Sequence, residues 1–269
     1  MRALVERWHP RGALWRNADF LWLWTAQTVS QLGSQITGLA LPLVAILVLE
    51  ASTFEIALLA VFNWVPFFFL SLPAGVWIDR FQRRRILIAA DWGRAVALGS
   101  IPLAYLVDAL SITQLYVVSL VAGTLTMFFD LSYQSYLPSL VKREELGEGN
   151  AKLEVSRSES QVAGPGLAGV LVSALTAPYA ILVDAISFVA SALSLSRIRQ
   201  KDEKPATSRS ERPSFRADMR EGLRFTLRHP IQRPIIAFVA GSNLFVNSSL
   251  RSTSSTPCAS SAYRRRRLG

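Results

Sequence analysis

The chain has 269 residues and a formal net charge of +10, and 51% of its residues are hydrophobic. The apolar residues gather into segments of about 20 residues, which is the length that a helix needs to cross a bilayer. A single cysteine excludes an intramolecular disulfide, and two histidines leave no cluster with the usual spacing of a Cys/His metal site. The composition excludes an ordinary soluble domain and indicates a membrane protein without a cofactor.

Six complete membrane spans are predicted, joined by polar connections. They cover residues 20–49, 54–78, 86–107, 115–141, 155–175 and 179–195. Residues 1–19 are basic but lack the short apolar core of a cleavable signal peptide, so the first span is expected to act as an uncleaved insertion signal. Residues 20–196 are therefore predicted to form an all-α bundle of six transmembrane helices.

Two local patterns mark the starts of spans. Ser52 and Glu55 have the spacing of a capping box ahead of the second span, where each side chain can satisfy a free backbone amide. Pro178 stands between the fifth and sixth spans, a position that suits the first turn of a helix.

The rest of the chain changes character in steps. Residues 197–230 are predicted to be a polar cytoplasmic connector, whose second half is either an amphipathic helix at the membrane surface or a solvated helix. Residues 231–247 have the composition of a seventh span that stops short. Residues 248–269 are rich in Ser, Thr and Arg, so we expect that the original reading frame is lost near Asn247 or that the chain is otherwise truncated. The alternative is a genuine basic tail.

Lysine and arginine residues occupy every second connection. They are Arg2, Arg7, Arg11 and Arg16, then Arg80, Arg83, Arg84 and Arg85, then Lys142 and Arg143, then Arg197, Arg199 and Lys201. The other connections, near residues 50–53, 108–114 and 174–178, contain none. The positive-inside rule places the N-terminus and the segment after the sixth span in the cytoplasm of a multi-pass protein of the inner (plasma) membrane. A surface that binds nucleic acid would not spare every second loop, so the expected partner is the lipid bilayer.

The connection between the second and third spans resembles the corresponding loop of major facilitator superfamily transporters, whose pattern is Gly-x-x-x-Asp-Arg-x-Gly-Arg-Arg. Its residues here are Gly75, Asp79 and Arg80, then Gln82 where glycine is usual, then Arg83 and Arg84. The fifth span is similar to the Gly-Pro-x-x-Gly-Gly motif of the family's antiporters at Gly164, Pro165 and Gly169, with Ala168 replacing one glycine. The spacing of residues 17–36, 128–141 and 182–195 also resembles the branch of enterobactin exporters and macrolide or multidrug efflux pumps.

This resemblance covers residues 16–247. It implies a twelve-helix fold of two six-helix halves, each built from inverted three-helix repeats, around a central cavity. This chain would supply the first half of a proton-coupled exporter that moves an amphipathic drug, macrolide or siderophore by alternating access. The alternative is a non-transporting fragment or pseudogene product that needs a missing C-terminal half. An enzyme is not expected, because neither histidine stands near a nucleophile and no glycine-rich phosphate loop precedes a helix.

The resemblance also assigns roles in the charged loop. Gly75 would let helices approach closely, as small residues do in lipid. The family's counterpart of Asp79 caps a helix of the other half, and the counterpart of Arg83 pairs with an acid in the fourth span, which here is Asp130. We expect an Arg83–Asp130 ion pair at the cytoplasmic rim that, with Asp79, closes the inside of the outward-open state. The alternative is that the arginines only enforce topology, which we favour for the last two arginines of the loop.

In the fifth span, Gly164, Gly166 and Gly169 are expected to thin one face of the helix, while Pro165 bends it. Such a helix suits a seal between the two halves. The alternative is plain helix packing.

The first span carries Gln27, Gln31 and Gln35 at a spacing of four residues, which places them on one face. Uncharged polar groups deep in a span face protein or a wet cavity. We predict that this stripe contacts substrate, with Asn63 and Gln134 as weaker candidates of the same kind. The alternative is hydrogen bonding between helices.

Several charged residues fall within spans. Asp91 and Arg94 are three residues apart and could pair locally on one helix. Asp184 has no nearby opposite charge in the sequence, so it is the candidate for proton coupling. Alternatively, Asp184 caps the outer end of its helix or pairs across spans.

Overall fold

The computed structural model describes residues 13–78 and 81–200. The predictions for the connector beyond residue 200, for the seventh span, for the tail, and for Asp79 and Arg80 lie outside the described residues.

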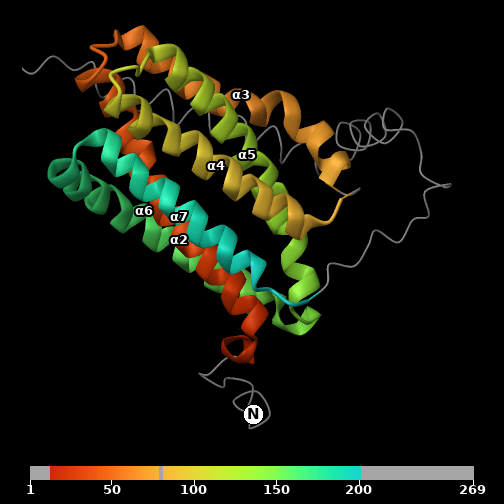
Figure 1. The fold of residues 1–269 in the computed structure, drawn as a ribbon. Helices are drawn as coiled ribbons and strands as arrows, with labels where there is room; N and C mark the ends of the chain where they lie inside the picture. Colours follow the sequence, from red (N-terminus) through yellow and green to blue (C-terminus); the bar gives the residue numbers. More distant parts are fainter. Residues whose placement is uncertain (1–12, 79–80, 201–269) are drawn as a thin grey trace, which may run out of the picture. The chain divides into compact units, whose positions relative to one another are not determined.

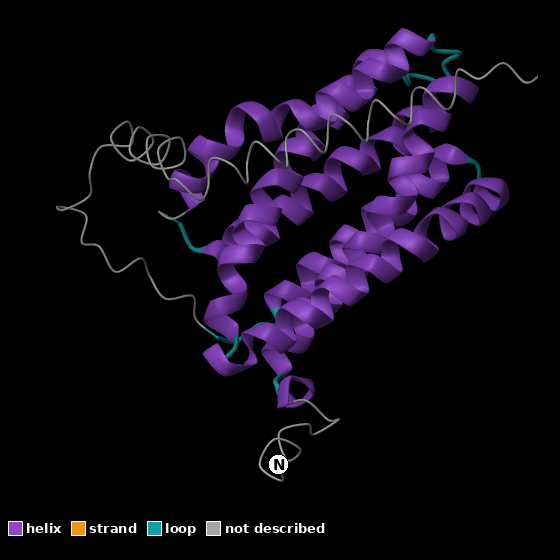
Figure 2. Ribbon diagram, turned by 180° about the vertical axis from the view of Figure 1, so that it is seen from behind, coloured by secondary structure: helices purple, strands orange, loops and turns teal. Residues whose placement is uncertain are grey.

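Six long α-helices and two short 3-10 helices make up the described part of the chain, which contains no strand (Figure 2). They are η1 (Ala13–Arg16), α2 (Ala18–Leu47), α3 (Thr53–Ile78), α4 (Arg83–Leu106), α5 (Ile112–Leu140), η2 (Arg143–Glu145), α6 (Leu146–Leu175) and α7 (Ala177–Ser196). The six long helices correspond to the six predicted spans. The prediction of an all-α polytopic bundle is therefore confirmed.

Five of these helices are long and apolar enough to cross a membrane: α2, residues 53–71 of α3, α4, α5 and α7. The exception is α6, which carries Glu154, Arg157 and Glu159 before its apolar second half. The fifth span was expected to start at residue 155, but the helix starts at Leu146. Polar residues can continue a helix beyond the hydrocarbon, so hydropathy underestimates its length.

Both predicted helix starts are confirmed. The Ser52 amide donates to Glu55 Oε2 at 2.8 Å, and the Glu55 amide donates to Ser52 Oγ at 3.4 Å, which completes a capping box. Pro178 lies in the first turn of α7. There its missing amide hydrogen leaves no intrahelical bond unmade.

The helices form two groups of three (Figure 1). In one group α5 packs against α3 and α4, in the other α2 packs against α6 and α7, and α4 packs against α7 to join them. Each group thus combines helices from both halves of the sequence.

The packing has an internal two-fold pattern. The first three long helices, α2, α3 and α4, correspond in order to the last three, α5, α6 and α7. The contact of α2 with α7 then corresponds to the contact of α5 with α4. In the same way, the contact of α2 with α6 corresponds to the contact of α5 with α3. Asn17, which caps the start of α2, donates to the Leu140 carbonyl at the end of α5, so equivalent helices run in opposite directions. These are the inverted three-helix repeats that the resemblance implies.

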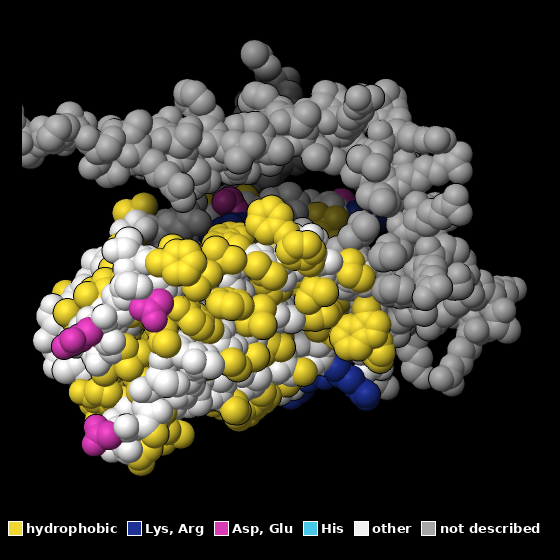
Figure 3. Space-filling view, turned by 90° about the horizontal axis from the view of Figure 1, so that it is seen from above, with side chains coloured by type: hydrophobic (Ala, Val, Ile, Leu, Met, Phe, Trp, Pro, Cys, Tyr) yellow, Lys and Arg dark blue, Asp and Glu magenta, His cyan; other side chains and the backbone are white. Residues whose placement is uncertain are grey.

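The surface of the described bundle is largely apolar. On the near side of the face that Figure 3 shows, hydrophobic side chains cover the middle, acidic side chains lie at one end and a basic cluster lies at the other, while further charged side chains of both signs lie behind the middle. On α3 the exposed large apolar residues are Phe54, Val61, Trp64, Phe68, Phe69, Leu70 and Trp77. A helix that exposes this much apolar surface suits a lipid environment.

A band of polar side chains separates two apolar clusters inside the bundle. On α2 one cluster ends at Ala26 and the other begins at Ile36, and on α4 the same boundary falls between Ala90 and Ala95. The buried polar residues at this level, together with those beside it on α7, are called the polar layer. They are Gln27, Ser30, Asp91, Arg94, Asp184, Ser187 and Ser191.

Candidate functional site

An ion pair within α4 forms the centre of the polar layer. Arg94 Nη2 donates to Asp91 Oδ1, as their spacing of three residues predicts. The guanidinium carbon of Arg94 lies 4.5 Å from the ring centre of Phe129 and 4.1 Å from that of Phe188. Two aromatic faces can stabilise a buried cation. The predicted local pair is therefore confirmed, in a buried setting beside two aromatic rings.

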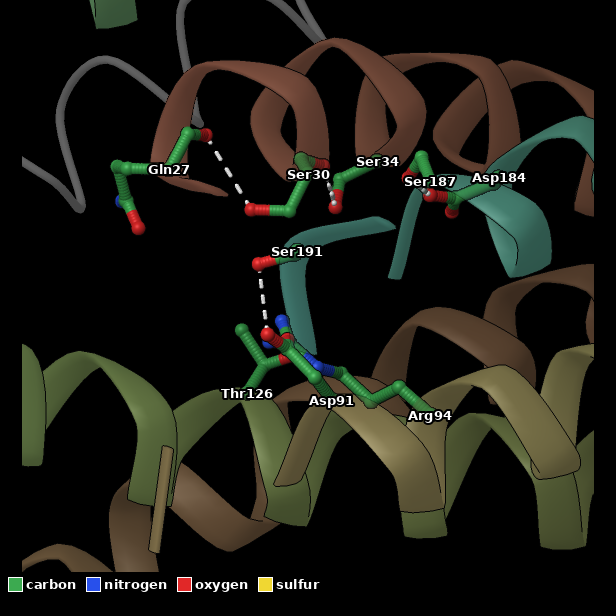
Figure 4. A network of polar contacts seen from close by, with 9 residues as sticks. All are labelled: Gln27, Ser30, Ser34, Asp91, Arg94, Thr126, Asp184, Ser187 and Ser191. Carbon is green, nitrogen blue, oxygen red and sulfur yellow. Dashed lines mark hydrogen bonds and ion pairs between the residues drawn. The ribbon is translucent and has the colours of Figure 1, made fainter. Parts of the chain in front are cut away.

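The ion pair also connects three helices (Figure 4). Ser191 Oγ of α7 donates to Asp91 Oδ2 at 2.6 Å, and Arg94 Nη1 lies 3.5 Å from Thr126 Oγ1 of α5. Because α4 and α7 belong to different groups, the Asp91–Ser191 bond ties the two groups together at the polar layer.

Asp184 is the second carboxylate of the layer and is 1% exposed. It accepts hydrogen bonds from Thr37 Oγ1 of α2 at 2.5 Å and from Ser187 Oγ at 2.9 Å. No described cation forms an ion pair with it. It lies inside α7 rather than at its end, so it does not cap the helix. It bonds across spans through a hydroxyl.

Gly33 of α2 makes room for this carboxylate. A Cβ atom at residue 33 would overlap Ser187 Oγ and Asp184 Oδ1. The close approach of α2 to α7 therefore depends on the absence of a side chain at this residue.

The three glutamines of α2 have different surroundings. Gln27 is buried and Gln31 half-buried, and the Oε1 atom of each has no hydrogen-bond partner among the described residues. Gln35 instead packs against α6, where a Cβ at Gly164 would come within 2.5 Å of its side chain. Contact of this stripe with substrate stays a prediction, although Gln35 clearly contributes to packing between helices.

The two weaker cavity candidates also differ. Gln134 is exposed on α5. Asn63 of α3 lies where α3 and α5 approach closely. A Cβ at Gly123 of α5 would overlap its carbonyl oxygen, so this approach depends on the glycine. The structural role of Gly123 was not foreseen.

Arg84 ties the charged loop to the end of α7. Its Nε donates to the Leu195 carbonyl at 3.1 Å, and its Nη2 donates to the Ser196 carbonyl. The Leu195 carbonyl also accepts from the Ile198 amide at 3.3 Å, and a cation at a helix C-terminus is favourable. Arg84 therefore holds a helix end, a contact that sequence reasoning did not predict for this arginine.

Asp130 lies deeper in the bundle than Arg83. Gly93 of α4 packs on Leu125 of the antiparallel α5, so these two residues lie at the same depth in the bundle. Toward the end of the bundle where α4 begins, Arg83 is ten residues along α4 from this contact, whereas Asp130 is five residues along α5. The difference of five residues is about 8 Å along the axis. Arg157 of α6 lies within electrostatic range of Asp130. The Arg83–Asp130 ion pair stays a prediction.

The glycines of the two motifs make few close contacts. Gly164 is buried under Gln35, whereas a Cβ at Gly166, Gly169 or Gly75 would meet nothing within 4 Å. The expectation that the three glycines of α6 thin one common face is wrong, because Gly164 points to α2 and the other two do not. Pro165 is exposed.

A polar stripe runs along one face of α6. Asn150, Glu154, Arg157 and Gln161 are exposed at spacings of four, three and four residues, which places them along one face. Tyr133 of α5 lies within electrostatic range of Glu154 and Arg157. Polar groups of a transmembrane bundle normally face protein or water.

Three hydroxyl residues that donate to the two carboxylates of the layer, Thr37, Ser187 and Ser191, were not singled out from the sequence. Ser187 and Ser191 follow Asp184 at three and seven residues, the spacing of one helix face, so this pattern was available. Their partners on α2 and α4 were not. No group of three potential metal ligands occurs within the described ranges.

Residues 11–253 match the model of a protein family described as transmembrane secretion effector. The chain belongs to this family of major facilitator transporters. Its relatives are transporters rather than enzymes, and with its apolar helices the chain is a multi-pass membrane protein.

Three relatives illustrate the family. The chain is 27% identical over 220 residues to the uncharacterized MFS-type transporter YfiS of Bacillus subtilis (strain 168), which covers 81% of this chain and 52% of the relative. It is 25% identical over 209 residues to the multidrug efflux pump Tap of Mycolicibacterium fortuitum, covering 76% and 51%. It is 22% identical over 204 residues to macrolide efflux protein A of Streptococcus pyogenes, covering 76% and 50%.

The chain spans about half the length of the curated relatives it matches. No solved structure matches it significantly.

Proposed function

We propose that this chain is one half of a proton-coupled exporter that moves amphipathic small molecules by alternating access. The observation that carries the proposal is Asp184, a carboxylate buried in a transporter bundle, bonded to two hydroxyls and to no cation. Burying a charge without an ion pair is costly, so gain or loss of a proton here would change the packing of α7 on α2. Coupling of proton movement to conformation needs such a group.

The proposed substrates are amphipathic drugs, macrolides or siderophores. Relatives of the chain are named as a multidrug efflux pump and a macrolide efflux protein. The polar stripe of α6, together with Gln31 of α2 and Gln134 of α5, offers uncharged and charged groups beside apolar surface. Such a mixed lining suits molecules with both kinds of surface.

A second six-helix half would complete the transporter. The chain spans about half of its relatives, and the open surfaces at Gly166 and Gly169 would accept a further helix for the seal between halves. In the outward-open state of the complete transporter, Asp79, Arg83 and Asp130 would close the cytoplasmic side. The alternative function, a fragment that does not transport, predicts no efflux in any combination.

The test is ethidium efflux from bacteria that lack their own drug exporters. The full chain is expressed alone and together with the second half of Mycolicibacterium fortuitum Tap. We expect efflux only from the combination, and we expect it to stop when an ionophore collapses the pH gradient.

Asp184→Asn should abolish this efflux while the protein still inserts in the membrane. Asp108→Asn changes an exposed carboxylate in the same way and should have no effect. Efflux that persists without a pH gradient, or in the Asp184→Asn variant, would show that proton coupling through this residue is wrong.

A further inference from the structure

We propose that Asp91 is a second proton-binding residue, which receives the proton from Asp184 along the hydroxyl face of α7. This inference rests on the proposed function, because it extends the path that starts at Asp184.

The geometry of α7 connects the two carboxylates. Ser187 and Ser191 lie on the face of α7 that carries Asp184, and Ser187 Oγ donates to Asp184 Oδ1 at 2.9 Å. One turn further, Ser191 Oγ donates to Asp91 Oδ2 at 2.6 Å. Figure 4 shows this row of hydroxyls between the two acids. Seven residues of helix separate the two ends, which is about 10 Å.

The acids at the two ends differ in their partners. Asp184 is bonded to hydroxyls, whereas Asp91 is held by the Arg94 guanidinium. Arg94 and Asp91 of α4 are the charged groups that act on Asp184. Among the described residues, no charged side chain of α2 or α6 acts on Asp184. On α5, Thr126 lies beside Arg94, and Asp130 lies within electrostatic range of Arg94.

The transfer balances in protons. The Asp184 carboxyl gives its proton to Ser187 Oγ, whose own proton passes to a water molecule that spans the turn. The water passes a proton to Ser191 Oγ, and the Ser191 hydroxyl proton moves to the Asp91 carboxylate. The path ends with an Asp184 carboxylate, a neutral Asp91 and unchanged hydroxyls and water.

Two buried polar atoms of the polar layer leave hydrogen-bonding capacity for a water. Arg94 Nε and Gln27 Oε1 are buried and have no hydrogen-bond partner among the described residues. A water needs two or more such partners to occupy a buried site.

A proton on Asp91 would also affect packing. It removes the negative charge that pairs with Arg94 and that strengthens the Ser191 bond joining the two helix groups. Arrival of the proton would therefore loosen α4 from α7, at the only point where the two groups exchange a hydrogen bond within the polar layer of the described chain.

The test uses infrared difference spectra of the full chain in lipid, recorded as the pH changes. Protonated carboxyl groups have a resolved C=O band, so two buried bands are expected. Asp184→Asn should remove one band. Asp91→Asn combined with Arg94→Gln should remove the other, and this double change avoids leaving Arg94 as an unpaired buried cation.

Two serine variants provide a matched comparison. Ser191→Ala should shift the Asp91 band, since it removes the hydrogen bond to this carboxyl. Ser194→Ala should not, because the Ser194 hydroxyl donates to the Ala190 carbonyl of its own helix. If the double variant has the spectrum of the unchanged chain, Asp91 takes no proton and the inference is wrong.

The relay itself is tested by the rate after a pH jump. In the Asp184→Asn variant the Asp91 band should grow about 100-fold more slowly, the order of effect expected for a lost proton-transfer group. An unchanged rate would overturn the relay. A failure of the proposed function would give a different result, in which the Asp91 band behaves as described but efflux is insensitive to the pH gradient.

Discussion

Single residues of the polar layer take partners that are remote in sequence. Thr37 and Asp184 are 147 residues apart, and Ser191 and Asp91 are 100 residues apart, yet each pair is joined by a short hydrogen bond. In both pairs a hydroxyl on one helix meets a carboxylate on another. Each contact depends on how the two helices are rotated and on the depth at which they meet. A side chain that keeps the two helices apart should therefore lower the stability of the bundle.

Gly33→Ala is expected to destabilise the bundle by about 1–3 kcal/mol, because a methyl group there would overlap Asp184 and Ser187 and force α2 away from α7. The measurement is the thermal unfolding midpoint of the purified chain in detergent. Gly38→Ala is the matched control on the same helix, since a Cβ at Gly38 meets nothing within 4 Å. Equal losses in both variants would show that the close contact is not the cause.

At the scale of elements, the ends of helices are tied to one another. Asp19 near the start of α2 accepts hydrogen bonds from the amides of Arg199 and Gln200, which follow α7, at 2.9 Å each. Arg84 in the first turn of α4 holds the last carbonyls of α7. The end of α7 is thus anchored to α4, and the start of the connector is anchored to α2.

Arg84→Ala should lower the free energy of unfolding by about 1 kcal/mol, because the carbonyls at the end of α7 lose a charged donor. Thermal unfolding in detergent measures this, and hydrogen exchange at residues 195–197 should become faster. Arg85→Ala removes the same charge from an exposed neighbour and should have little effect. The cap is refuted if the two variants lose the same stability.

At the scale of the whole molecule, the basic residues of the described connections lie at one end of the bundle. The exposed Glu50 and Asp108 lie in connections without cations, and Arg85 lies in the charged loop at the opposite end. This division is what the positive-inside rule requires of a bundle with six crossings.

Impermeant maleimide labelling should show this orientation in a chain that lacks Cys258. Glu50→Cys and Asp108→Cys are expected to react in intact cells, because their connections face outward. Arg85→Cys should react only after the membrane is made permeable. Labelling of Arg85→Cys in intact cells would reverse the predicted topology.

The sequence by itself determined the elements of this protein. Four features depend on residues within one helix or one turn: the apolar segments, the capping box at Ser52, the proline in the first turn of α7 and the Asp91–Arg94 pair. Such local features follow from composition and spacing. The length of α6 did not follow, because its polar first half is helical outside the apolar window.

Only the tertiary structure decided which faces meet. Ser191 with Asp91, Thr37 with Asp184, and Gln35 over Gly164 all join separate helices. The two groups of three likewise each combine helices from both halves of the sequence. Apolar content places each helix in the membrane but is nearly the same around its circumference, so it says little about rotation or neighbours. Packing of small residues and pairing of buried polar groups select those contacts, and both depend on partners that are distant in the chain.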